Sequence, residues 1–209
     1  MDNDILKYIY DHITPEDPIL EELFRQTHIR FVNPNMVSGH IQGRVLEIIS
    51  KMISPNKILE IGTFTGYSAI CLAKGLKPGG KLITIELNDE LYDFSREYFE
   101  KSGLSNRIEQ MTGKAQDIVP YLDGLFDLVY IDGDKREYCD YFKMVKDKVK
   151  KYGYILADNV LWGGKVMNEK NGDAQTRGIM EFNNMIIRES DFENAILPIR
   201  DGLMIIRKL

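Results

Sequence analysis

The chain has 209 residues, 44% of them hydrophobic and 28% charged, which is typical of one soluble globular domain that buries about 70% of its unfolded surface. The net charge of −5 argues against a protein that holds nucleic acid over its whole surface. The cysteines, Cys71 and Cys139, have no metal-ligand spacing, so we expect two reduced thiols.

The chain begins with early acidic residues and no long apolar run, in "MDNDILKYIYDHITPEDP". We therefore expect neither a signal peptide nor a membrane anchor, and a cytoplasmic protein. Residues 1–55 carry three helical patterns, at about 3–12, 18–28 and from Gly39 onward. We expect one domain over 1–209, in which 1–55 form a helical cap.

Short apolar segments then alternate with helical patterns. Strands are predicted at 57–61, 81–86, 107–111, 126–131 and 153–157, and helices at 66–76, 89–103, 115–122 and 138–153. This alternation predicts an α/β fold, with a doubly wound parallel sheet covered by helices on both faces. At the end of the chain, 194–199 and 203–209 flank the turn signal "RDG" and predict an antiparallel hairpin at the sheet edge.

The first two strands lead into residues that suit a nucleoside. Gly62 and Gly66 in "EIGTFTGYS" permit a tight turn and close approach of a ligand, although such a turn alone is compatible with several functions. The segment lacks the spacing of dinucleotide and P-loop motifs. Glu86 ends the second strand and can accept hydrogen bonds from both ribose hydroxyls, while a solvated charge at a strand end is the other interpretation. Gln116, in "TGKAQD", is a candidate for reading the edge of a base.

Charged residues follow two further strands, in "LVYIDGDK" and "YILADN". We expect these strands to be neighbours, about 5 Å apart, so that Asp132, Asp158 and Asn159 converge. Three oxygen donors without Cys or His suit a hard cation, with Mg²⁺ favoured and Ca²⁺ or Mn²⁺ as alternatives. A polar cluster solvated by water, or one that caps the next helix, is the other interpretation.

Five motifs in this order and spacing are "ILEIGTFTGYSAICLA", "LITIELN", "GKAQD", "FDLVYIDGDK" and "ILADNVLWGGKV". Together they resemble the S-adenosylmethionine-dependent O-methyltransferases of the catechol and caffeoyl-CoA type, from about residue 18 to the end of the chain. The resemblance implies a seven-stranded Rossmann-like sheet with an antiparallel last strand. It also implies a homodimer in which 1–55 contribute substrate or dimer contacts, while 56–209 form the cofactor-binding sheet and the metal site. It also implies cofactor contacts at Ser38, Glu60, Gly62, Thr63, Ser68, Glu86, Ala115 and Asp132.

The resemblance further assigns Asp132, Asp158 and Asn159 as the metal ligands and Lys135 as the general base. A nearby cation disfavours the ammonium form of a lysine and promotes ionisation of a coordinated hydroxyl. The sequence is also compatible with Lys135 as a surface lysine at the start of the next helix. Asp134 is expected to orient Lys135, to contact the cofactor or to cap the next helix.

The acceptor is the least defined part of the prediction. Residues 160–184 have the polar, glycine-containing composition of a substrate loop. Trp162 is expected to stack on an aromatic ring or to serve as core or lid, and Arg177 to pair with a substrate anion or with Glu181. The animal catechol enzymes have a carboxylate before the final hairpin turn, where this chain has Asn194 and Ala195, which weakens a strict catechol assignment.

The first hypothesis is therefore metal-dependent methyl transfer to a hydroxyl of a small aromatic acceptor. Some relatives methylate a hydroxylated uridine in tRNA, and the basic run "KMVKDKVKK" at 143–151 keeps that alternative open, although such a run is usually a solvated helix face. A cofactor-binding protein without catalysis is a third possibility, which is disfavoured by the presence of Lys135, Asp132, Asp158 and Asn159.

Overall fold

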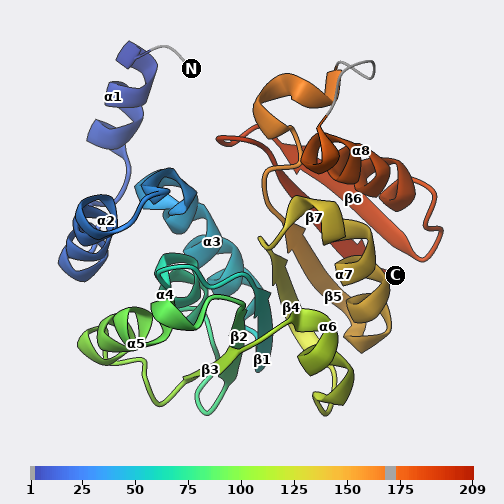
Figure 1. The fold of residues 1–209 in the computed structure, drawn as a ribbon, viewed down its shortest axis with the longest axis horizontal. Coiled ribbons are helices and arrows are strands. Elements are labelled where there is room, and N and C mark those ends of the chain that lie inside the picture. The colour runs from blue at the N-terminus through green and yellow to red at the C-terminus, as the bar shows by residue number, and fades with distance from the viewer. Residues whose placement is uncertain (1–2, 168–172) are drawn as a thin grey trace.

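The computed structural model describes residues 3–167 and 173–209, and one seven-stranded sheet forms its centre (Figure 1). The strand order is β3-β2-β1-β4-β5-β7-β6. Strands β1 to β5 pair in parallel, whereas β7 runs antiparallel to both of its neighbours, β5 and β6. The strands are β1 (Lys57–Ile61), β2 (Lys81–Glu86), β3 (Ile108–Thr112), β4 (Phe126–Ile131), β5 (Val149–Ala157), β6 (Phe192–Leu197) and β7 (Leu203–Lys208). The predicted fold class and the antiparallel last strand are confirmed.

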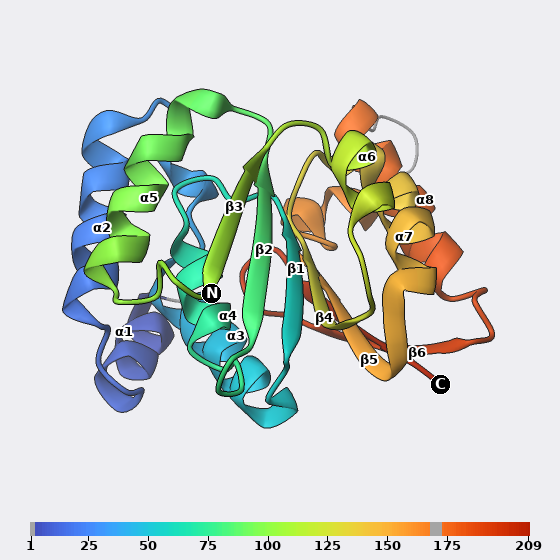
Figure 2. The same cartoon turned by 90° about the horizontal axis from the view of Figure 1, so that it is seen from below.

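Helices cover both faces of this sheet, as Figure 2 shows. The α-helices are α1 (Asn3–His12), α2 (Pro18–Arg30), α3 (Gly39–Ile53), α4 (Tyr67–Ala73), α5 (Tyr92–Lys101), α6 (Ala115–Ile118), α7 (Tyr138–Val145) and α8 (Ala174–Ile186). Helices α2 to α5 lie on one face and α6 to α8 on the other, while α1 stands away from the sheet.

Alternation along the strands divides the core between these two faces. Leu59 and Ile61 of β1 belong to the apolar cluster that includes α6, α7 and α8. Ile58, one residue earlier, belongs to the cluster that includes α2 to α5. Because successive strand side chains point to opposite faces, a strand covered on both sides needs apolar residues at nearly every position. This explains the short continuous apolar segments of the sequence.

The helix predicted over 138–153 is too long. Helix α7 ends at Val145, and β5 begins at Val149 rather than at the expected residue 153. Val149 pairs with Phe126 of β4, across an irregularity in the register. Long-range pairing with β4 thus overrides the helical spacing of this lysine-rich segment.

The predicted terminal hairpin is confirmed as β6 and β7, which lie at one edge of the sheet. Its turn contains two residues in the left-handed region, Arg200 with φ +48° and Gly202 with φ +87°. A glycine adopts this conformation readily, whereas an arginine does so at a cost. The turn therefore holds Arg200 in an uncommon backbone conformation.

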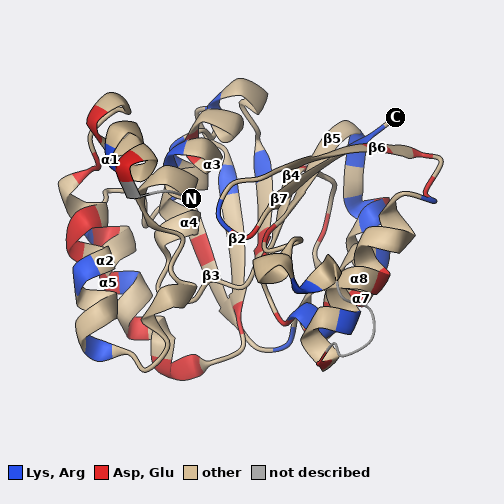
Figure 3. Cartoon of the chain, turned by 90° about the horizontal axis from the view of Figure 1, so that it is seen from above, with Lys and Arg blue, Asp and Glu red and all other residues tan. Residues whose placement is uncertain are grey.

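Charges of both signs are spread over the helices. Figure 3 shows acidic and basic segments interspersed along α2, α5 and α7. Cys71 and Cys139 are both free thiols, in agreement with the prediction. Within residues 3–167 and 173–209, no helix combines the length and the apolar character needed to cross a membrane.

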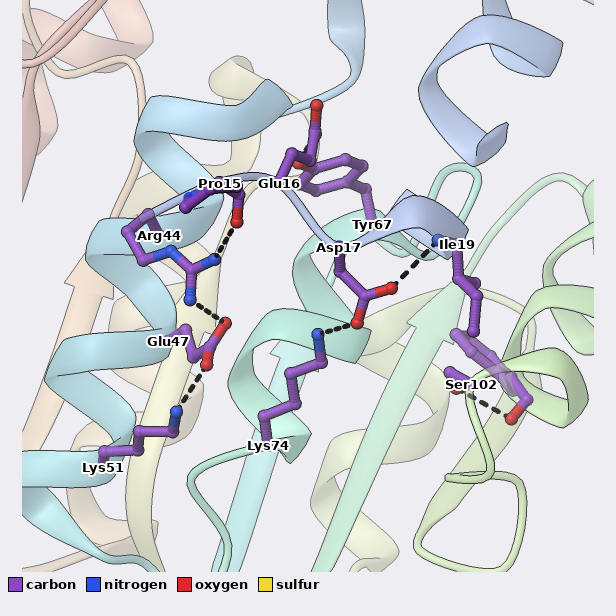
Figure 4. Close-up of polar contacts among 11 residues, drawn as sticks. Pro15, Glu16, Asp17, Ile19, Arg44, Glu47, Lys51, Tyr67, Lys74 and Ser102 are labelled. Atoms are coloured by element: carbon purple, nitrogen blue, oxygen red, sulfur yellow. Dashed lines mark hydrogen bonds and ion pairs between the residues drawn. The ribbon is translucent and has the colours of Figure 1, made fainter. Parts of the chain in front are cut away.

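Polar contacts fix the linker between α1 and α2 to the body of the protein (Figure 4). Arg44 of α3 donates a hydrogen bond to the Pro15 carbonyl at 2.9 Å. Asp17, which caps α2, forms a 2.6 Å ion pair with Lys74 at the end of α4. The linker is thereby attached to α3 and α4, and it carries α2 to its place beside the sheet.

Candidate active site

A cavity of about 870 Å³ lies where β1, β2, β4 and β5 end, which is the expected ligand position in an open α/β sheet. Of the predicted site residues, Glu60 does not line this cavity. Those that line it are Ser38, Gly62, Thr63, Ser68, Glu86, Ala115, Asp132, Lys135, Asp158 and Asn159. Side chains from four strand ends and from the start of α3 therefore meet in one site.

Glu86 lies on the cavity wall at the end of β2. Its carboxylate accepts hydrogen bonds from the backbone N–H groups of Phe64 at 2.8 Å and Asn88 at 3.0 Å. A carboxylate has about four acceptor sites, so this one can still accept from a ligand diol. Gln116 also lines the cavity, and its amide donates to Glu137 at 2.8 Å.

The two glycines after β1 are required by packing within the protein. A Cβ at Gly62, where φ is +99°, would lie 2.5 Å from the carbonyl oxygen of Asp132. A Cβ at Gly66, where φ is +91°, would lie 2.6 Å from the ring of Phe99 on α5. Gly62 borders the cavity and Gly66 does not. The first glycine thus brings the loop after β1 against the end of β4, and the second seats it on α5.

Glu60 lies in β1 beneath the cavity and is fully buried. The Thr84 hydroxyl donates to its carboxyl group at 2.5 Å, and Thr63, on the cavity wall, is 2.5 Å from Thr84. Burial raises the pKa of Glu60 to about 8, so this carboxyl is protonated at neutral pH. A hydroxyl chain therefore joins a neutral Glu60 to the cavity, and its contact with the cofactor stays a prediction.

Lys135 is buried against the ends of β4 and β5, with only 7% of its surface exposed. Its ammonium nitrogen lies 2.7 Å from Oδ1 of Asp132 and 2.8 Å from the hydroxyl oxygen of Tyr138. Tyr138 in turn donates to the backbone carbonyl of Asp158 at 3.0 Å. The lysine is thus fixed inside the cavity, and the interpretation of Lys135 as a surface lysine is wrong.

Asp158 follows β5 and is 4% exposed. Its Oδ2 atom accepts a hydrogen bond from the side-chain amide of Gln42 at 2.7 Å, whereas its buried Oδ1 atom has no partner. Burial raises the pKa of the Asp158 carboxyl, and the charge of Asp132 raises it further. A buried carboxylate oxygen without a donor is the kind of atom that a cation stabilises.

The donor set at this position has two carboxylates and one amide. Among the described residues, no three or more His, Cys, Asp or Glu side chains are grouped so that they could hold a metal. Asp132, Asp158 and Asn159 all line the cavity, and β4 and β5 are paired neighbours as predicted. This set suits a hard cation that takes its remaining ligands from water or substrate oxygens.

The structure shows the surroundings of three residues for which the sequence left several roles possible. Asp134 lines the cavity, accepts the backbone N–H of Arg136 at 3.0 Å and forms an ion pair with its guanidinium, which lowers the pKa of Asp134. Asp134 therefore caps the short 3-10 helix Lys135–Glu137 that precedes α7, and not the helix that includes Tyr138 and Tyr141. Trp162 lines the cavity, and its indole N–H is buried without a partner. Arg177 lies on α8, away from the cavity wall.

The terminal hairpin contributes residues that the sequence did not identify. Asn194 and Ala195 lie within β6 and do not border the cavity, whereas Arg200 and Asp201 of the turn do. Gln42 was also missed, although a glutamine on the buried side of an amphipathic helix is an unusual feature. Residues 160–167 and 173–184 are described, while 168–172 of the predicted substrate loop lie outside the described residues.

Comparison with known proteins identifies the family to which the chain belongs. The family model described as O-methyltransferase matches residues 10–209. A catechol O-methyltransferase of Niastella koreensis is 34% identical over 170 residues, which cover 79% of this chain and 74% of that protein. Caffeoyl-CoA O-methyltransferase 2 of Petunia hybrida is 30% identical over 223 residues, which cover 98% and 90% of the two chains.

Solved structures agree with this result. An O-methyltransferase of Streptomyces achromogenes involved in tomaymycin synthesis, in complex with SAM (S-adenosylmethionine), has a TM-score of 0.91 and 29% identity. The alignment covers 99% of this chain and 96% of that one. An O-methyltransferase of Bacillus cereus in complex with SAH (S-adenosylhomocysteine) has a TM-score of 0.89 and 28% identity, with coverage of 99% and 97%. The chain thus belongs to the O-methyltransferase family, as a SAM-dependent enzyme of the catechol and caffeoyl-CoA type.

Proposed function

We propose that this enzyme depends on a divalent cation and methylates one hydroxyl of a small aromatic acceptor that carries two adjacent hydroxyls. The observation that supports the cation most directly is the Oδ1 atom of Asp158, which is buried without a hydrogen-bond partner beside the cavity. An unpaired buried carboxylate oxygen is costly. A cation at the ends of β4 and β5 removes this cost.

Asp132, Asp158 and Asn159 are the residues that would hold the cation. Oxygen ligands favour Mg²⁺, with Ca²⁺ or Mn²⁺ as alternatives. The cation supplies Lewis acidity that favours ionisation of an acceptor hydroxyl. The protein itself contributes a carboxylate pair whose positions are fixed by strand pairing and by hydrogen bonds from Gln42 and Lys135.

Lys135 is the proposed general base that takes the proton of the acceptor hydroxyl. Its amine is held on the cavity wall by Asp132 and Tyr138, so its position is set before the acceptor arrives. SAM supplies an already activated methyl group, which leaves the enzyme to align the acceptor oxygen and to remove its proton.

The proposed cofactor-binding set begins with Glu86, which accepts from the ribose hydroxyls. Its carboxylate is fixed on the wall by two backbone N–H groups, and an ionised acceptor strengthens a hydrogen bond. The remaining proposed contacts are Ser38, Glu60, Gly62, Thr63, Ser68, Ala115 and Asp132. Glu60 takes part through Thr84 and Thr63, rather than from the wall itself.

The acceptor is proposed to be catechol-like or caffeoyl-type. Apolar side chains border the cavity, among them Val32, Met36 and Trp162, and such a wall favours an aromatic ring. The names of the relatives from Niastella koreensis and Petunia hybrida point to the same acceptors. Asp201 in the hairpin turn provides a carboxylate at the wall, although Asn194 and Ala195 lack one.

The tRNA alternative gains no support from the basic run. Lys143 and Lys150 form ion pairs with Asp140 and Asp127, and Lys148 donates to backbone carbonyls. The run also leads into the amino end of β5, whereas the cavity lies at the carboxyl ends of the strands. Lys148 and Lys150 therefore serve the fold, Lys143 lies in an exposed surface pair, and a small acceptor is the better proposal.

We also propose a homodimer that uses the N-terminal helices. Ile5 and Tyr8 of α1 and Ile29 of α2 are exposed by 53%, 63% and 64%, and α1 stands away from the sheet (Figure 1). Apolar side chains on a projecting helix favour burial against another chain. Light scattering after size-exclusion chromatography should give twice the mass of one chain. A monomer at all protein concentrations would contradict the proposed homodimer.

The cation and the acceptor are tested together by methyl transfer from labelled SAM. Catechol, caffeic acid, caffeoyl-CoA and bulk tRNA are offered with EDTA, and then with Mg²⁺ or Mn²⁺ in excess. The expected result is methylation of the diol acceptors. EDTA should abolish this methylation, and either cation should restore it. Full activity in EDTA would contradict the proposed dependence on a cation. Labelling of tRNA alone would show that tRNA, and not a small aromatic diol, is the acceptor.

A further inference from the structure

We propose that Gln42 and Arg200 are positioning residues for the cation site. In this inference, Arg200 orients the side-chain amide of Gln42, and the amide holds the Asp158 carboxylate with its Oδ1 atom available to the cation. The inference rests on the cation proposed above. Gln42 belongs to α3 and Arg200 to the β6–β7 turn, so neither lies on the strands that carry the proposed cation ligands.

The Gln42 side chain connects these elements. It is 1% exposed, so its polar atoms have little access to water. Its Nε2 atom lies 2.7 Å from Oδ2 of Asp158 and 3.2 Å from the hydroxyl oxygen of Tyr130. Its Oε1 atom lies 3.1 Å from Nη1 of Arg200. Both ends of the amide are therefore used inside the protein.

The chemistry of the two partners determines which way the amide points. A guanidinium only donates hydrogen bonds, so the group facing Arg200 must be the amide oxygen. An ionised carboxylate only accepts them, so the group facing Asp158 must be the amide nitrogen. The reversed amide would place two donors together at Arg200 and two acceptors together at Asp158. Arg200 thus fixes the orientation in which Gln42 serves Asp158.

Arg200 is itself held firmly in place. Its guanidinium donates to the backbone carbonyls of Val37 at 2.8 Å and Asn35 at 3.2 Å, and also to that of Ser38. Its backbone has φ +48°, which is unfavourable for a residue with a long side chain. The contacts on 35–38 and Gln42 offset this strain, and they tie the hairpin turn to the wall of the cavity.

These contacts divide the tasks of the two Asp158 oxygens. Oδ2 is engaged by Gln42, and Oδ1 is left without a partner. Without the amide, the carboxylate could rotate, and Oδ2 would lose its donor inside the protein. Residues that orient metal ligands typically contribute about 10- to 100-fold to metal affinity. We therefore expect an effect of this size from Gln42, without direct contact between Gln42 and the cation.

The test measures Mn²⁺ binding directly, by electron paramagnetic resonance of free Mn²⁺ at saturating SAH. Gln42→Met keeps the length of the side chain and removes both hydrogen-bonding ends. Ser50→Ala is the matched control, because Ser50 is also a buried polar residue of α3 but donates to Leu72. Gln42→Met should weaken Mn²⁺ binding about 10- to 100-fold, with SAH affinity and melting temperature close to those of the control.

Arg200→Met provides a second variant at an exposed position, and it decides the question if Gln42→Met does not fold. It should weaken Mn²⁺ binding as well, by less than Gln42→Met, because the amide remains but is free to reverse. Unchanged Mn²⁺ affinity in either folded variant would overturn the positioning role.

Asp158→Asn separates this role from the cation itself. If wild type binds Mn²⁺ no better than Asp158→Asn, the proposed cation site is wrong, and the inference drawn from it falls as well. If Asp158→Asn loses Mn²⁺ while Gln42→Met and Arg200→Met keep it, the cation site stands and only the positioning role is wrong.

Discussion

Lys135 and Asp132 form an ion pair inside the cavity, with 2.7 Å between Nζ and Oδ1. Both side chains are largely shielded from water, being 9% and 17% exposed. The same carboxylate belongs to the proposed cation site, so lysine and cation share one negative partner. Base and cation are therefore expected to act together on the acceptor.

The role of Lys135 as base predicts a loss that depends on the acceptor. Lys135→Met should lower the rate about 10²- to 10⁴-fold with catechol, the usual range for removal of a general base. A nitrocatechol, whose hydroxyl is more acidic, should lose less because less proton abstraction remains. Rates at saturating Mg²⁺ across acceptors of graded acidity check this. Lys143→Met, on the exposed side of α7, is the control, and an equal loss for every acceptor would make Lys135 a positioning residue.

Glu86 should contribute to cofactor affinity. Glu86→Gln removes the charged acceptor proposed for the ribose hydroxyls, and this should cost about 1.5–3 kcal/mol of SAH binding. Titration calorimetry provides the measurement, and thermal unfolding without ligand checks that the loop after β1 stays folded. Glu90→Gln, an exposed position nearby, should bind SAH like wild type. Unchanged affinity in folded Glu86→Gln would remove Glu86 from the cofactor site.

Glu60 should make stability fall as pH rises. The pKa of its carboxyl is raised by burial from an ordinary 4.5 to about 8, so between these pH values the folded state holds a proton that the unfolded state has released. This contributes a loss of about 1.4 kcal/mol of unfolding free energy per pH unit in that window. Glu60→Gln should lack this slope and gain stability over wild type from pH 5 to pH 8.

Chemical denaturation at several pH values measures the effect. Glu109→Gln, at an exposed position of β3, should follow the wild-type pH dependence. Parallel curves for wild type and Glu60→Gln would show that Glu60 has an ordinary pKa in the folded protein.

Gly66 should be needed for packing as well as for its backbone conformation. Gly66→Ala introduces a Cβ 2.6 Å from the Phe99 ring, whereas Gly79→Ala, at a similar φ of +78°, meets nothing within 4 Å. Gly79→Ala should cost about 1–2 kcal/mol for the left-handed conformation. Gly66→Ala should cost about 1–3 kcal/mol more because of overpacking. Equal losses in denaturant unfolding would mean that the ring moves aside freely.

The strand ends were predictable because one rule covers them. Parallel strands deliver their carboxyl ends to the same edge of a sheet, so Asp132 and Asp158 could be paired from the sequence alone. The alternation of side chains along β1 also indicates that Glu60 does not lie on the cavity wall. Residues 58 and 60 of β1 share a face, and Ile58 belongs to the cluster under α2 to α5. Glu60 therefore points to the α2 to α5 side of the sheet, and Thr84 and Thr63 link it to the cavity.

The contact between Gln42 and Arg200 could not be predicted from local sequence patterns. Gln42 is 116 residues from Asp158 in the chain and 158 residues from Arg200. Local spacing predicts that Gln42 lies in a helix and Arg200 in a turn, and it does not indicate that the two meet. The predicted start of β5 was wrong for the same reason. Pairing with β4, and not the spacing of the lysines, determines where the strand begins.

The place of β7 in the sheet has a consequence for synthesis on the ribosome. β7 follows the other strands of this sheet along the chain, yet it lies between β5 and β6, so β5 keeps an open edge until residues 203–208 have emerged. Unpaired strand edges in a growing chain favour aggregation. The nascent protein is therefore open to edge-to-edge association until β7 pairs with β5, and Arg200 of the β6–β7 turn reaches the backbone carbonyls of 35–38 as this hairpin docks.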